Sequence, residues 1–506
     1  MFDIFAIYKF FKSKFSLRDV LLLSVIVLLF LATRLINLDK FPIFTDEGIY
    51  IHWAKVAWHD ASWRFVSLTD GRQPLQTWAT IPFLKLFPNN ALLGGRLFAV
   101  FSGFISLTGI FTLFYYLFGK RAAYIGAILY VFTPYFLFYD RLALMDSGIN
   151  AAFIWILFMS IVLVRNLRLD LALIFGIVSG ISLLAKSSMQ LFVGLSIFAP
   201  LLIVEKKISV FLKKTVNYFV SFAIGLVIAV AIYNIQRLSP FLHFVAEKNN
   251  TFIYTIPELL KNPFNSFWFN LYSIPYYILF ESGFFLVIFG LFGWFILLKK
   301  DLKLGLYLSV WTLLPFGILC FVAKVMYPRY IIFFATLFSI YFTYALVSLS
   351  NNNKKIIPLV MGVFFLSVVY FDYTTLFNYK NIVMPAIDRG QYVDGGSSGY
   401  GIKEIIEYAR ELSKDKPVRI VAEGTFGMSG DVLDVFIRTN DRISVKSYWP
   451  LAPADLKENQ KDLVAEHVLV VYVYQSDFPS TLPLKLIKQF VKPSGKSTIN
   501  LFELTK

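Results

Sequence analysis

The stretch Phe44-Thr45-Asp46-Glu47-Gly48-Ile49-Tyr50 places two adjacent carboxylates shortly after the first long apolar segment, residues 20–38. That segment is close to the ~20 residues that a helix needs to cross the hydrocarbon core of a bilayer. We therefore expect Asp46 and Glu47 to lie where a membrane helix meets water. The rest of the chain is interpreted as residues assembled around these two acids.

The composition excludes an ordinary soluble protein. Of the 506 residues, 57% are hydrophobic and only 16% are charged, whereas about a quarter of the residues of a soluble domain are charged. The net charge of +16 is compatible with nucleic-acid binding, but Lys and Arg concentrate at alternate helix ends, as the positive-inside rule requires. We expect a polytopic α-helical protein whose partner is the lipid bilayer, with no nucleic acid. The single cysteine, Cys320, excludes an internal disulfide.

The basic loops predict about eleven transmembrane helices in the plasma (cytoplasmic) membrane, with the N-terminus in the cytoplasm and the C-terminus outside. The basic residues Lys9, Lys12, Lys14 and Arg18 precede the first span. Interfacial helices are expected in the tryptophan-rich outer loop 39–90, and a second aromatic outer loop covers residues 234–278. The predicted spans are residues 20–38, 91–118, 122–139, 147–164, 169–185, 188–204, 215–233, 279–298, 304–323, 329–349 and 356–375.

Residues 1–380 are thus expected to form a transmembrane domain, and residues 381–506 an extracytoplasmic α/β domain. Gly395-Gly396-Ser397-Ser398-Gly399 predicts a flexible joint between them. Strand-length apolar runs then alternate with helical patterns, which indicates a mainly parallel sheet. The predicted strands are Val418–Ala422, Ile443–Tyr448 and Val468–Tyr474, and the predicted helices are Gly401–Leu412, Ser429–Arg438 and Pro453–Gln460.

Ionisable residues gather at the expected outer ends of helices and in outer loops, and none lies in mid-helix. They are Asp46, Glu47, Arg72, Arg141, Asp146, Lys186 and Arg329. A reaction that joins a hydroxyl or amine to a sugar carbon needs a base, and a carboxylate beside apolar surface suits that role. Asp46 or Glu47 is a candidate base, and Asp146 would complete the pocket or, with Asp46, hold a divalent cation. The alternative is that Asp46 and Glu47 only favour the positive end of an interfacial helix.

The candidate anion site is formed by two arginine motifs. Gly71-Arg72-Gln73-Pro74-Leu75 lies in the same outer loop as the acids, and Tyr327-Pro328-Arg329-Tyr330 opens a late span. Proline favours the first position of a helix, and a helix N-terminus with an arginine beside it suits a lipid phosphate. The alternative is that Arg96, Lys186 and Arg329 only extend their charges from the bilayer toward water.

Taken in order, these motifs resemble a known superfamily. Asp46-Glu47, Gly71-Arg72-Gln73-Pro74-Leu75 and Gly95-Arg96-Leu97-Phe98 are followed by Arg141-Leu142-Ala143-Leu144-Met145-Asp146 and Pro328-Arg329-Tyr330. They resemble the type-C membrane glycosyltransferases of the dolichyl-phosphate-mannose protein mannosyltransferase superfamily, which includes the aminoarabinose lipid A transferases. The resemblance covers residues ~20–350 and only weakly the C-terminal domain.

The resemblance implies transfer of a sugar from a polyprenyl-phosphate carrier to an extracytoplasmic acceptor (a protein, a lipid or a cell-envelope glycan) with inversion at the anomeric carbon. It implies that Asp46 is the base, with Glu47 beside it and Asp146 as a second acid. Arg72, where family members often have lysine, and Arg329 would hold the carrier phosphate. The full set of expected substrate-binding residues is Arg72, Arg96, Arg141, Lys186, Tyr327, Arg329 and Tyr330. No cofactor is required, and a divalent metal is optional.

Two other classes of function compete with an enzyme. A lipid-carrier transporter or flippase places its polar residues near the bilayer midplane, in broken helices. A non-catalytic envelope assembly protein would bind a partner through the C-terminal domain. The clustering of charge at one face of the predicted membrane domain favours the glycosyltransferase.

Overall fold

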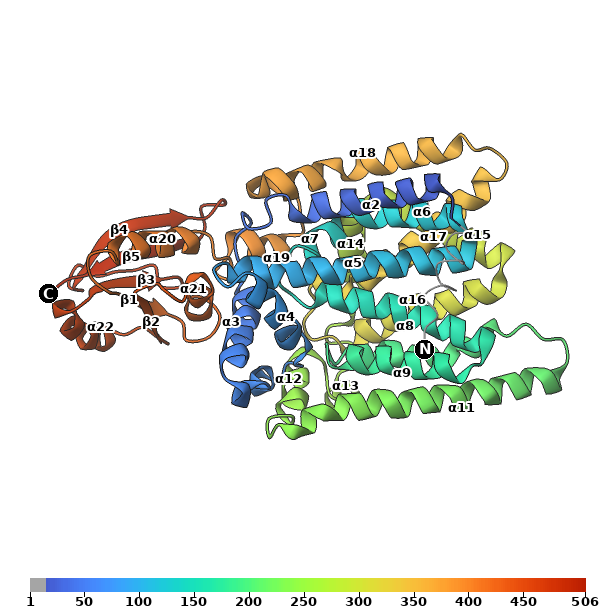
Figure 1. The fold of residues 1–506 in the computed structure, drawn as a ribbon, viewed down its shortest axis with the longest axis horizontal. Helices are drawn as coiled ribbons and strands as arrows, with labels where there is room; N and C mark the ends of the chain where they lie inside the picture. Colours follow the sequence, from blue (N-terminus) through green and yellow to red (C-terminus); the bar gives the residue numbers. More distant parts are fainter. Residues whose placement is uncertain (1–14) are drawn as a thin grey trace.

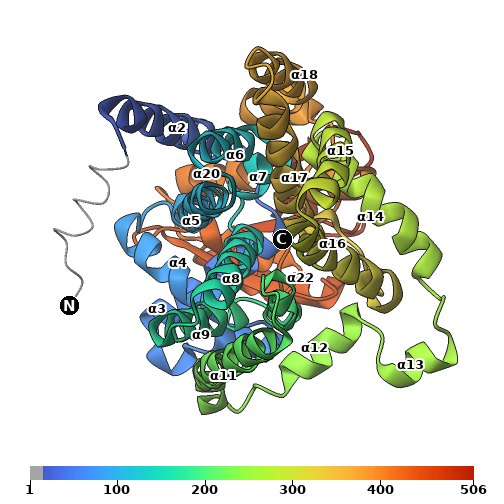
Figure 2. The ribbon, with the colours of Figure 1, turned by 90° about the vertical axis from the view of Figure 1, so that its right-hand side faces the viewer.

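The computed structural model describes residues 15–506, so the predicted flank residues Lys9, Lys12 and Lys14 lie outside the described residues. Figure 1 shows long helices that run side by side, with a small sheet domain at one end of the bundle. Helices α3 (Thr45–His59) and α4 (Leu75–Leu86) lie between these two parts, and Figure 2 shows the bundle from its other end. The loop that follows the first apolar helix therefore forms a layer between the two parts.

The remaining helices of the larger part follow one another with short connections. They are α2 (Leu17–Leu35), α5 (Ala91–Phe118), α6 (Lys120–Phe132), α7 (Pro134–Tyr139), α8 (Asp146–Asn166), α9 (Leu169–Leu183), α10 (Met189–Leu195), α11 (Ile208–Tyr233), α12 (Phe244–Phe252), α13 (Ile256–Lys261), α14 (Phe267–Ser282), α15 (Phe284–Lys300), α16 (Leu302–Val322), α17 (Phe333–Ser350), α18 (Ile356–Phe377) and α19 (Ala386–Arg389).

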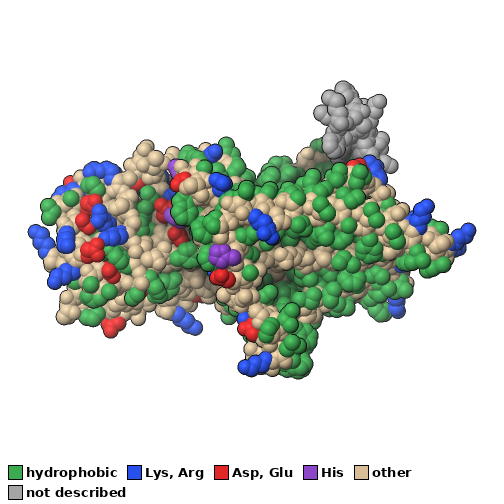
Figure 3. Space-filling model, turned by 90° about the horizontal axis from the view of Figure 1, so that it is seen from below, with side chains coloured by type: hydrophobic (Ala, Val, Ile, Leu, Met, Phe, Trp, Pro, Cys, Tyr) green, Lys and Arg blue, Asp and Glu red, His purple; other side chains and the backbone are tan. Residues whose placement is uncertain are grey.

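The chain is an integral membrane protein. Within residues 15–506, six helices are long and apolar enough to cross a bilayer, and there are seven crossings if α14 and α15 form one span. Figure 3 shows hydrophobic side chains over the helical part and charged side chains over the sheet domain and at the opposite tip. Helix length and composition do not confirm the predicted number of about eleven spans, which stays a prediction. Helix α2 is not among the six and contains Arg18, Asp19 and Arg34.

Two predicted spans are broken in the structure. The expected span 122–139 divides into α6 and α7 at Thr133-Pro134, because proline disfavours helical geometry in the residue before it. The expected span 279–298 is corrected to α14 and α15, which meet at 112°. Gly283 lies between them with φ +84°, a conformation that glycine adopts without steric cost. The predicted outer loop 234–278 therefore contains α12, α13 and most of α14.

Close helix pairs in the bundle meet at glycines. A Cβ on Gly293 of α15 would lie 2.0 Å from the Tyr341 carbonyl oxygen of α17, and one on Gly176 of α9 would lie 2.5 Å from the Gly225 carbonyl oxygen of α11. Hydrophobic burial contributes little to helix association in lipid, so close backbone packing at small residues supplies much of the attraction.

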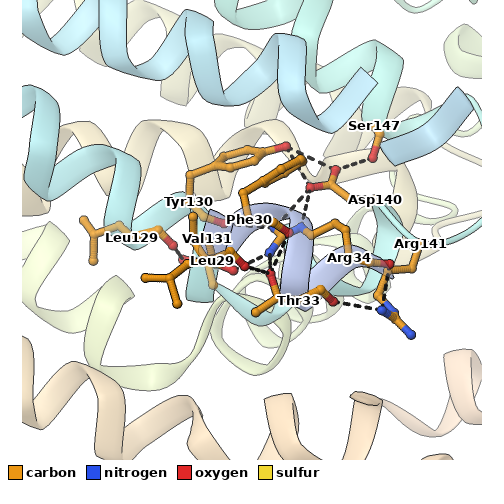
Figure 4. Close-up of polar contacts among 11 residues, drawn as sticks. Leu29, Phe30, Thr33, Arg34, Leu129, Tyr130, Val131, Asp140, Arg141 and Ser147 are labelled. Carbon is orange, nitrogen blue, oxygen red and sulfur yellow. Dashed lines mark hydrogen bonds and ion pairs between the residues drawn. The ribbon is translucent and has the colours of Figure 1, made fainter. Parts of the chain in front are cut away.

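A buried ion pair joins α2 to the end of α7 (Figure 4). Arg34 donates to the Asp140 carboxylate from Nε at 3.2 Å and from Nη2 at 3.1 Å, and both side chains are almost fully buried. Asp140 also accepts from the Tyr130 hydroxyl at 3.1 Å and from the Ser147 hydroxyl. A buried charge is stable only when it is paired and its remaining polar atoms are hydrogen-bonded, as they are here. This network fixes the C-terminal end of α2, from which the chain continues toward Asp46.

The small domain contains a five-stranded mixed sheet in the order β2-β1-β3-β5-β4. The predicted strands correspond to β1 (Val418–Glu423), β2 (Ile443–Tyr448) and β3 (His467–Tyr472), and the predicted helices to α20 (Ile402–Leu412), α21 (Gly430–Phe436) and α22 (Pro453–Asn459). β1 pairs in parallel with both β2 and β3. The prediction of a mainly parallel sheet missed β4 (Leu484–Val491) and β5 (Thr498–Leu504), which form an antiparallel hairpin that pairs with β3.

The predicted flexible joint is wrong, because that segment is fixed by hydrogen bonds. The Thr45 amide donates to the Ser397 carbonyl oxygen at 3.0 Å, and the Gly399 amide donates to the Ile43 carbonyl oxygen at 2.7 Å. A Cβ on Gly399 would lie 2.9 Å from the same Ile43 oxygen. The glycine-rich composition thus permits close approach of two backbones.

The small domain shares a hydrophobic core with α3. Ile51 and Ala54 of α3 belong to the same buried cluster as Val432 of α21 and Ile420 of β1. At the edge of this cluster the Asp434 carboxylate lies 2.9 Å from both His52 Nδ1 and Lys55 Nζ. The core of the larger part extends past residue 380, since it includes Ile382, Met384, Tyr392 and Val393.

We expect the substitution Arg34→Ala to lower the free energy of unfolding by about 3–5 kcal/mol, because it leaves the Asp140 carboxylate charged and unpaired in the interior. The measurement is thermal or chemical unfolding of the purified protein in detergent. Arg18→Ala, on an exposed residue of the same helix, should change stability by less than about 0.5 kcal/mol. Equal effects of the two substitutions would contradict the assigned role of Arg34.

Candidate active site

The candidate site centres on Asp46, in the first turn of α3. Its Oδ1 atom lies 3.2 Å from Arg72 Nη2, and its Oδ2 atom lies 2.9 Å from Arg329 Nη1. The three side chains are largely buried, with 10–19% of their surface exposed. Residues separated by up to 283 positions in the chain therefore meet at one carboxylate.

Local sequence explains the positions of both arginines. Gly71 ends the 3-10 helix η2 (Val66–Asp70) with φ +68°, and a Cβ there would lie 2.3 Å from the Phe244 carbonyl oxygen, so only glycine fits before Arg72. Pro328 occupies the first position of the 3-10 helix η5 (Pro328–Ile331), where a missing backbone N–H costs nothing. Arg329 follows it directly.

Aromatic rings surround the guanidinium groups. The Arg329 guanidinium carbon lies 5.2–5.6 Å from the ring centres of Phe44, Tyr327 and Tyr330. That of Arg72 lies 5.2 Å from the Tyr50 ring centre. Such rings attract cations and exclude water, which strengthens every charge interaction nearby.

A second acidic residue, Asp146, joins the site through Lys186. Asp146 begins α8 and is 4% exposed, and its Oδ1 atom lies 3.6 Å from Lys186 Nζ. The same ammonium lies 4.4 Å from the centre of the Tyr330 ring, which also lies 5.5 Å from the Arg329 guanidinium carbon. Asp46, Asp146 and the cations between them thus line one region.

Glu47 and Arg96 are not free to contact a substrate, so their predicted roles are corrected. Both are fully buried. Arg96 Nε and Nη2 donate to the two Glu47 oxygens at 2.8 and 2.9 Å, and its other N–H groups donate to carbonyl oxygens of residues 38, 41 and 42. Glu47 also accepts from the amides of Phe44 and Ala143 at 2.9 and 2.7 Å. The pair holds the start of α3 in place.

Arg141 is also corrected to a structural residue (Figure 4). Its guanidinium donates to the carbonyl oxygens of Thr33, Arg34 and Ile36 at 2.8–2.9 Å, at the C-terminal end of α2. It is 5% exposed. Helix ends leave carbonyl groups without partners, and a buried arginine satisfies them.

The structure adds residues that the sequence analysis missed. Asp70 lies 3.0 Å from Arg72 Nε and 2.7 Å from Lys248 Nζ, so Arg72 is held by Asp70 as well as by Asp46. The fully buried Asp388 accepts from the Tyr139 hydroxyl at 2.6 Å and lies near Arg329. Asp70 directly precedes the Gly71-Arg72 motif, so its position in the sequence could have indicated that it lies beside Arg72. Asp388 has no comparable local signal.

Opposing effects set the acidity of the site. Burial raises the pKa of the Asp46 carboxyl, but the positive charges of Arg72 and Arg329 outweigh it and lower that pKa to about 2. Burial raises the pKa of the Asp388 carboxyl, and the negative charge of Asp146 adds to that increase, although the Tyr139 hydroxyl and the charge of Arg329 oppose it. At neutral pH Asp46 is therefore fully ionised and bound to both arginines.

The donor set around Asp46 does not fit a divalent cation. Within residues 15–506 no three His, Cys, Asp or Glu side chains converge as metal ligands. The Asp46 oxygens are bound to two guanidinium groups, and Asp146 is paired with Lys186.

The chain is similar to known proteins in part of its sequence and in its fold. Residues 72–233 match the family described as dolichyl-phosphate-mannose-protein mannosyltransferase. No curated protein matches the chain in sequence.

Solved structures share the fold over nearly the whole chain. ArnT from Cupriavidus metallidurans, bound to undecaprenyl phosphate, is 12% identical with a TM-score of 0.60, and the match covers 95% of this chain and 97% of ArnT. The apo state of the same ArnT is 13% identical with a TM-score of 0.62, and the coverage of the two chains is the same. The Archaeoglobus fulgidus oligosaccharyltransferase AglB, in complex with an inhibitory peptide and a dolichol-phosphate, is 13% identical with a TM-score of 0.51. This match covers 91% of this chain and 70% of AglB. The resemblance to the type-C glycosyltransferase superfamily, including its fold, is confirmed.

We expect Glu47→Gln to lower the free energy of unfolding by about 3–5 kcal/mol, because the buried Arg96 would lose the carboxylate with which it is paired. Glu247→Gln, on an exposed residue of α12, is the matched control and should change it by less than about 0.5 kcal/mol. Unfolding midpoints in detergent measure the difference. If Glu47→Gln retained full stability but lost activity, a catalytic role for Glu47 would replace the structural one.

Proposed function

We propose that this protein is a glycosyltransferase that moves a sugar from a polyprenyl-phosphate carrier to an acceptor on the side of the membrane that faces the C-terminal domain. The observation that carries the proposal is the Asp46 carboxylate held between Arg72 and Arg329. The carboxylate of Asp46 suits proton acceptance, and the guanidinium groups of Arg72 and Arg329 suit the binding of a phosphate. The carriers bound to ArnT and AglB support the same ligand class.

Arg329 has a donor to spare for the carrier phosphate. Its Nε–H is buried and makes no hydrogen bond to the described residues, whereas its Nη1 group is bound to Asp46. An unsatisfied buried donor costs about 1–3 kcal/mol, so a ligand oxygen at this position is favoured. Arginine also binds phosphate oxygens through two parallel N–H groups.

The proposed step inverts the anomeric carbon. The acceptor oxygen bonds to that carbon as its proton passes to Asp46. The bond from the carbon to the carrier phosphate oxygen breaks, and its electron pair stays with the phosphate. The phosphate gains negative charge, which Arg72 and Arg329 stabilise most strongly in the transition state. Asp146, Lys186 and Tyr330 would line the sugar or the acceptor.

Carrier binding also makes Asp46 a better base. The phosphate competes with Asp46 for the same guanidinium groups and adds a negative charge beside it, and both effects raise the pKa of Asp46. A base is most effective when its pKa lies near the working pH. The pKa of Asp46 would thus rise only when the sugar donor is bound. In the empty site Asp46 would stay ionised.

We expect Asp46→Asn to reduce sugar transfer by about 10²–10⁴-fold, while the protein remains folded and still binds the carrier. The assay incubates purified protein with a panel of polyprenyl-phosphate hexoses and pentoses plus candidate acceptors, and measures release of the carrier phosphate. Asp60→Asn, at the exposed other end of α3, is the matched control. A flippase or an assembly protein would keep its function in the Asp46→Asn variant, so transfer retained by that variant would overturn the assignment.

The pH dependence should differ between the free and the carrier-bound enzyme. The pKa of Asp46 is lowered from 3.8 to about 2 in the free protein, so kcat/KM should show no loss from Asp46 until the pH falls through that range. The acid limb of kcat, which reports the complex, should lie at higher pH. Asp388→Asn serves as a control, because the raised pKa of Asp388 would otherwise add a titration of its own. Identical acid limbs in kcat and kcat/KM would contradict competition for the arginines.

A further inference from the structure

A cavity of about 250 Å³ lies away from the candidate active site, at the other end of α3. Its walls come from the last turn of α3, the link between α4 and α5, and residues 437–439 after α21. Asp46 and His59 lie at opposite ends of α3, 13 residues apart, which is roughly 20 Å along a helix. The cavity is therefore a separate site that joins the small domain to the membrane part.

The cavity is lined by cations and apolar groups. Lys55, His59 and Arg438 contribute positive or titratable groups, and none of the lining residues is acidic. Lys55 Nζ is bound to the Asp434 carboxylate at 2.9 Å. The His59 Nδ1 atom donates to the Lys55 carbonyl oxygen at 2.8 Å. The Arg438 guanidinium is exposed and has no hydrogen bond or ion pair to any residue of the described chain, 15–506, although its charge acts on the Asp441 carboxylate.

Arg438 also borders an adjoining cavity of about 270 Å³. The other cations there are already neutralised: Lys403 Nζ lies 3.6 Å from Asp39, and Arg410 lies 2.8 Å from Asp441. Arg438 is thus the cation of this region that remains available to an external anion.

The position of the first cavity relates it to the bilayer. α5, which is long and apolar enough to cross a membrane, begins at Ala91 in the cavity wall. Leu86 and Phe87, directly before it, are 71% and 37% exposed. Phe87, Pro88, Trp58 and Ile437 supply apolar wall. A cationic rim above apolar surface at the end of a span matches the boundary between lipid headgroups and acyl chains.

We propose that this cavity binds the phosphate-bearing headgroup of an anionic membrane lipid. Arg438 would pair with the phosphate through parallel N–H groups, and the ring of Trp58 and the side chain of Phe87 would contact the glycerol and the upper acyl chain. The bound lipid would link residues 437–439 of the small domain to the start of α5. This site is independent of the proposed transferase activity and uses none of its residues.

The test is native mass spectrometry of the purified full-length protein in neutral detergent, titrated with phosphatidylglycerol or phosphatidylcholine. We expect tighter binding of phosphatidylglycerol, and a loss of about fivefold in its affinity in Arg438→Ala, which corresponds to one basic group at a membrane surface. Arg64→Ala removes an exposed arginine of the predicted outer loop 39–90 that lies outside the cavity. This control should leave the affinity for phosphatidylglycerol unchanged. Because Arg438 is exposed, its variant should unfold at the wild-type temperature.

Three results would overturn the proposal. The first is equal loss in Arg438→Ala and Arg64→Ala, which would indicate unspecific attraction to a basic surface. The second is loss of phosphatidylglycerol binding in Arg329→Ala, which would place the lipid in the candidate active site. The third is displacement of the lipid by free glycerol phosphate at the same ionic strength, which would make a soluble phosphate the ligand. Retained binding in Arg329→Ala with loss in Arg438→Ala supports the proposal even if no sugar transfer is ever detected.

Discussion

The buried pair between Glu47 and Arg96 is the interaction on which the site depends. Arg96 is anchored in α5, and its guanidinium binds both Glu47 oxygens and three carbonyl oxygens of the chain that leads into α3. This arrangement fixes the position and the rotation of the first turn of α3. Asp46, one residue before Glu47, then points in a different direction, because successive helical residues are about 100° apart. Two neighbouring acids thus take different tasks: one holds the helix, and the other faces two arginines.

Several charged groups at the helix ends near the site are compensated where they leave water. The Arg34–Asp140 pair and the Arg141 contacts fix the end of α2, and the Glu47–Arg96 pair fixes the next helix. Each is fully engaged within the protein. Around Asp46 the compensation is incomplete, because the buried Nε–H of Arg329 has no hydrogen-bond partner among residues 15–506, whereas Arg72 is paired with both Asp46 and Asp70. An unsatisfied buried donor favours the binding of an incoming phosphate oxygen.

The small domain takes part in the architecture of the site. It is hydrogen-bonded to the residues just before Asp46, shares a core with α3, and contacts His52 and Lys55 of the same helix through Asp434. α3 therefore has the candidate active site at one end and the proposed lipid site at the other. Both ends of this helix are fixed by contacts, so a lipid at the second site would reinforce the contact between domain and bilayer without touching the reacting groups.

The sequence by itself determined the membrane class, the order of the polar motifs and the first three strands of the small domain. These features are local: hydrophobic runs, charge at helix ends, and Gly-Arg or Pro-Arg steps. It did not determine that Glu47, Arg96 and Arg141 are structural, because an arginine that binds carbonyl oxygens and one that binds a ligand look the same in a linear chain. It also missed the β4–β5 hairpin, although Pro493-Ser494-Gly495 lies between its strands. Only the tertiary structure decided which charges are satisfied by the protein, since that depends on contacts between residues that are distant in sequence.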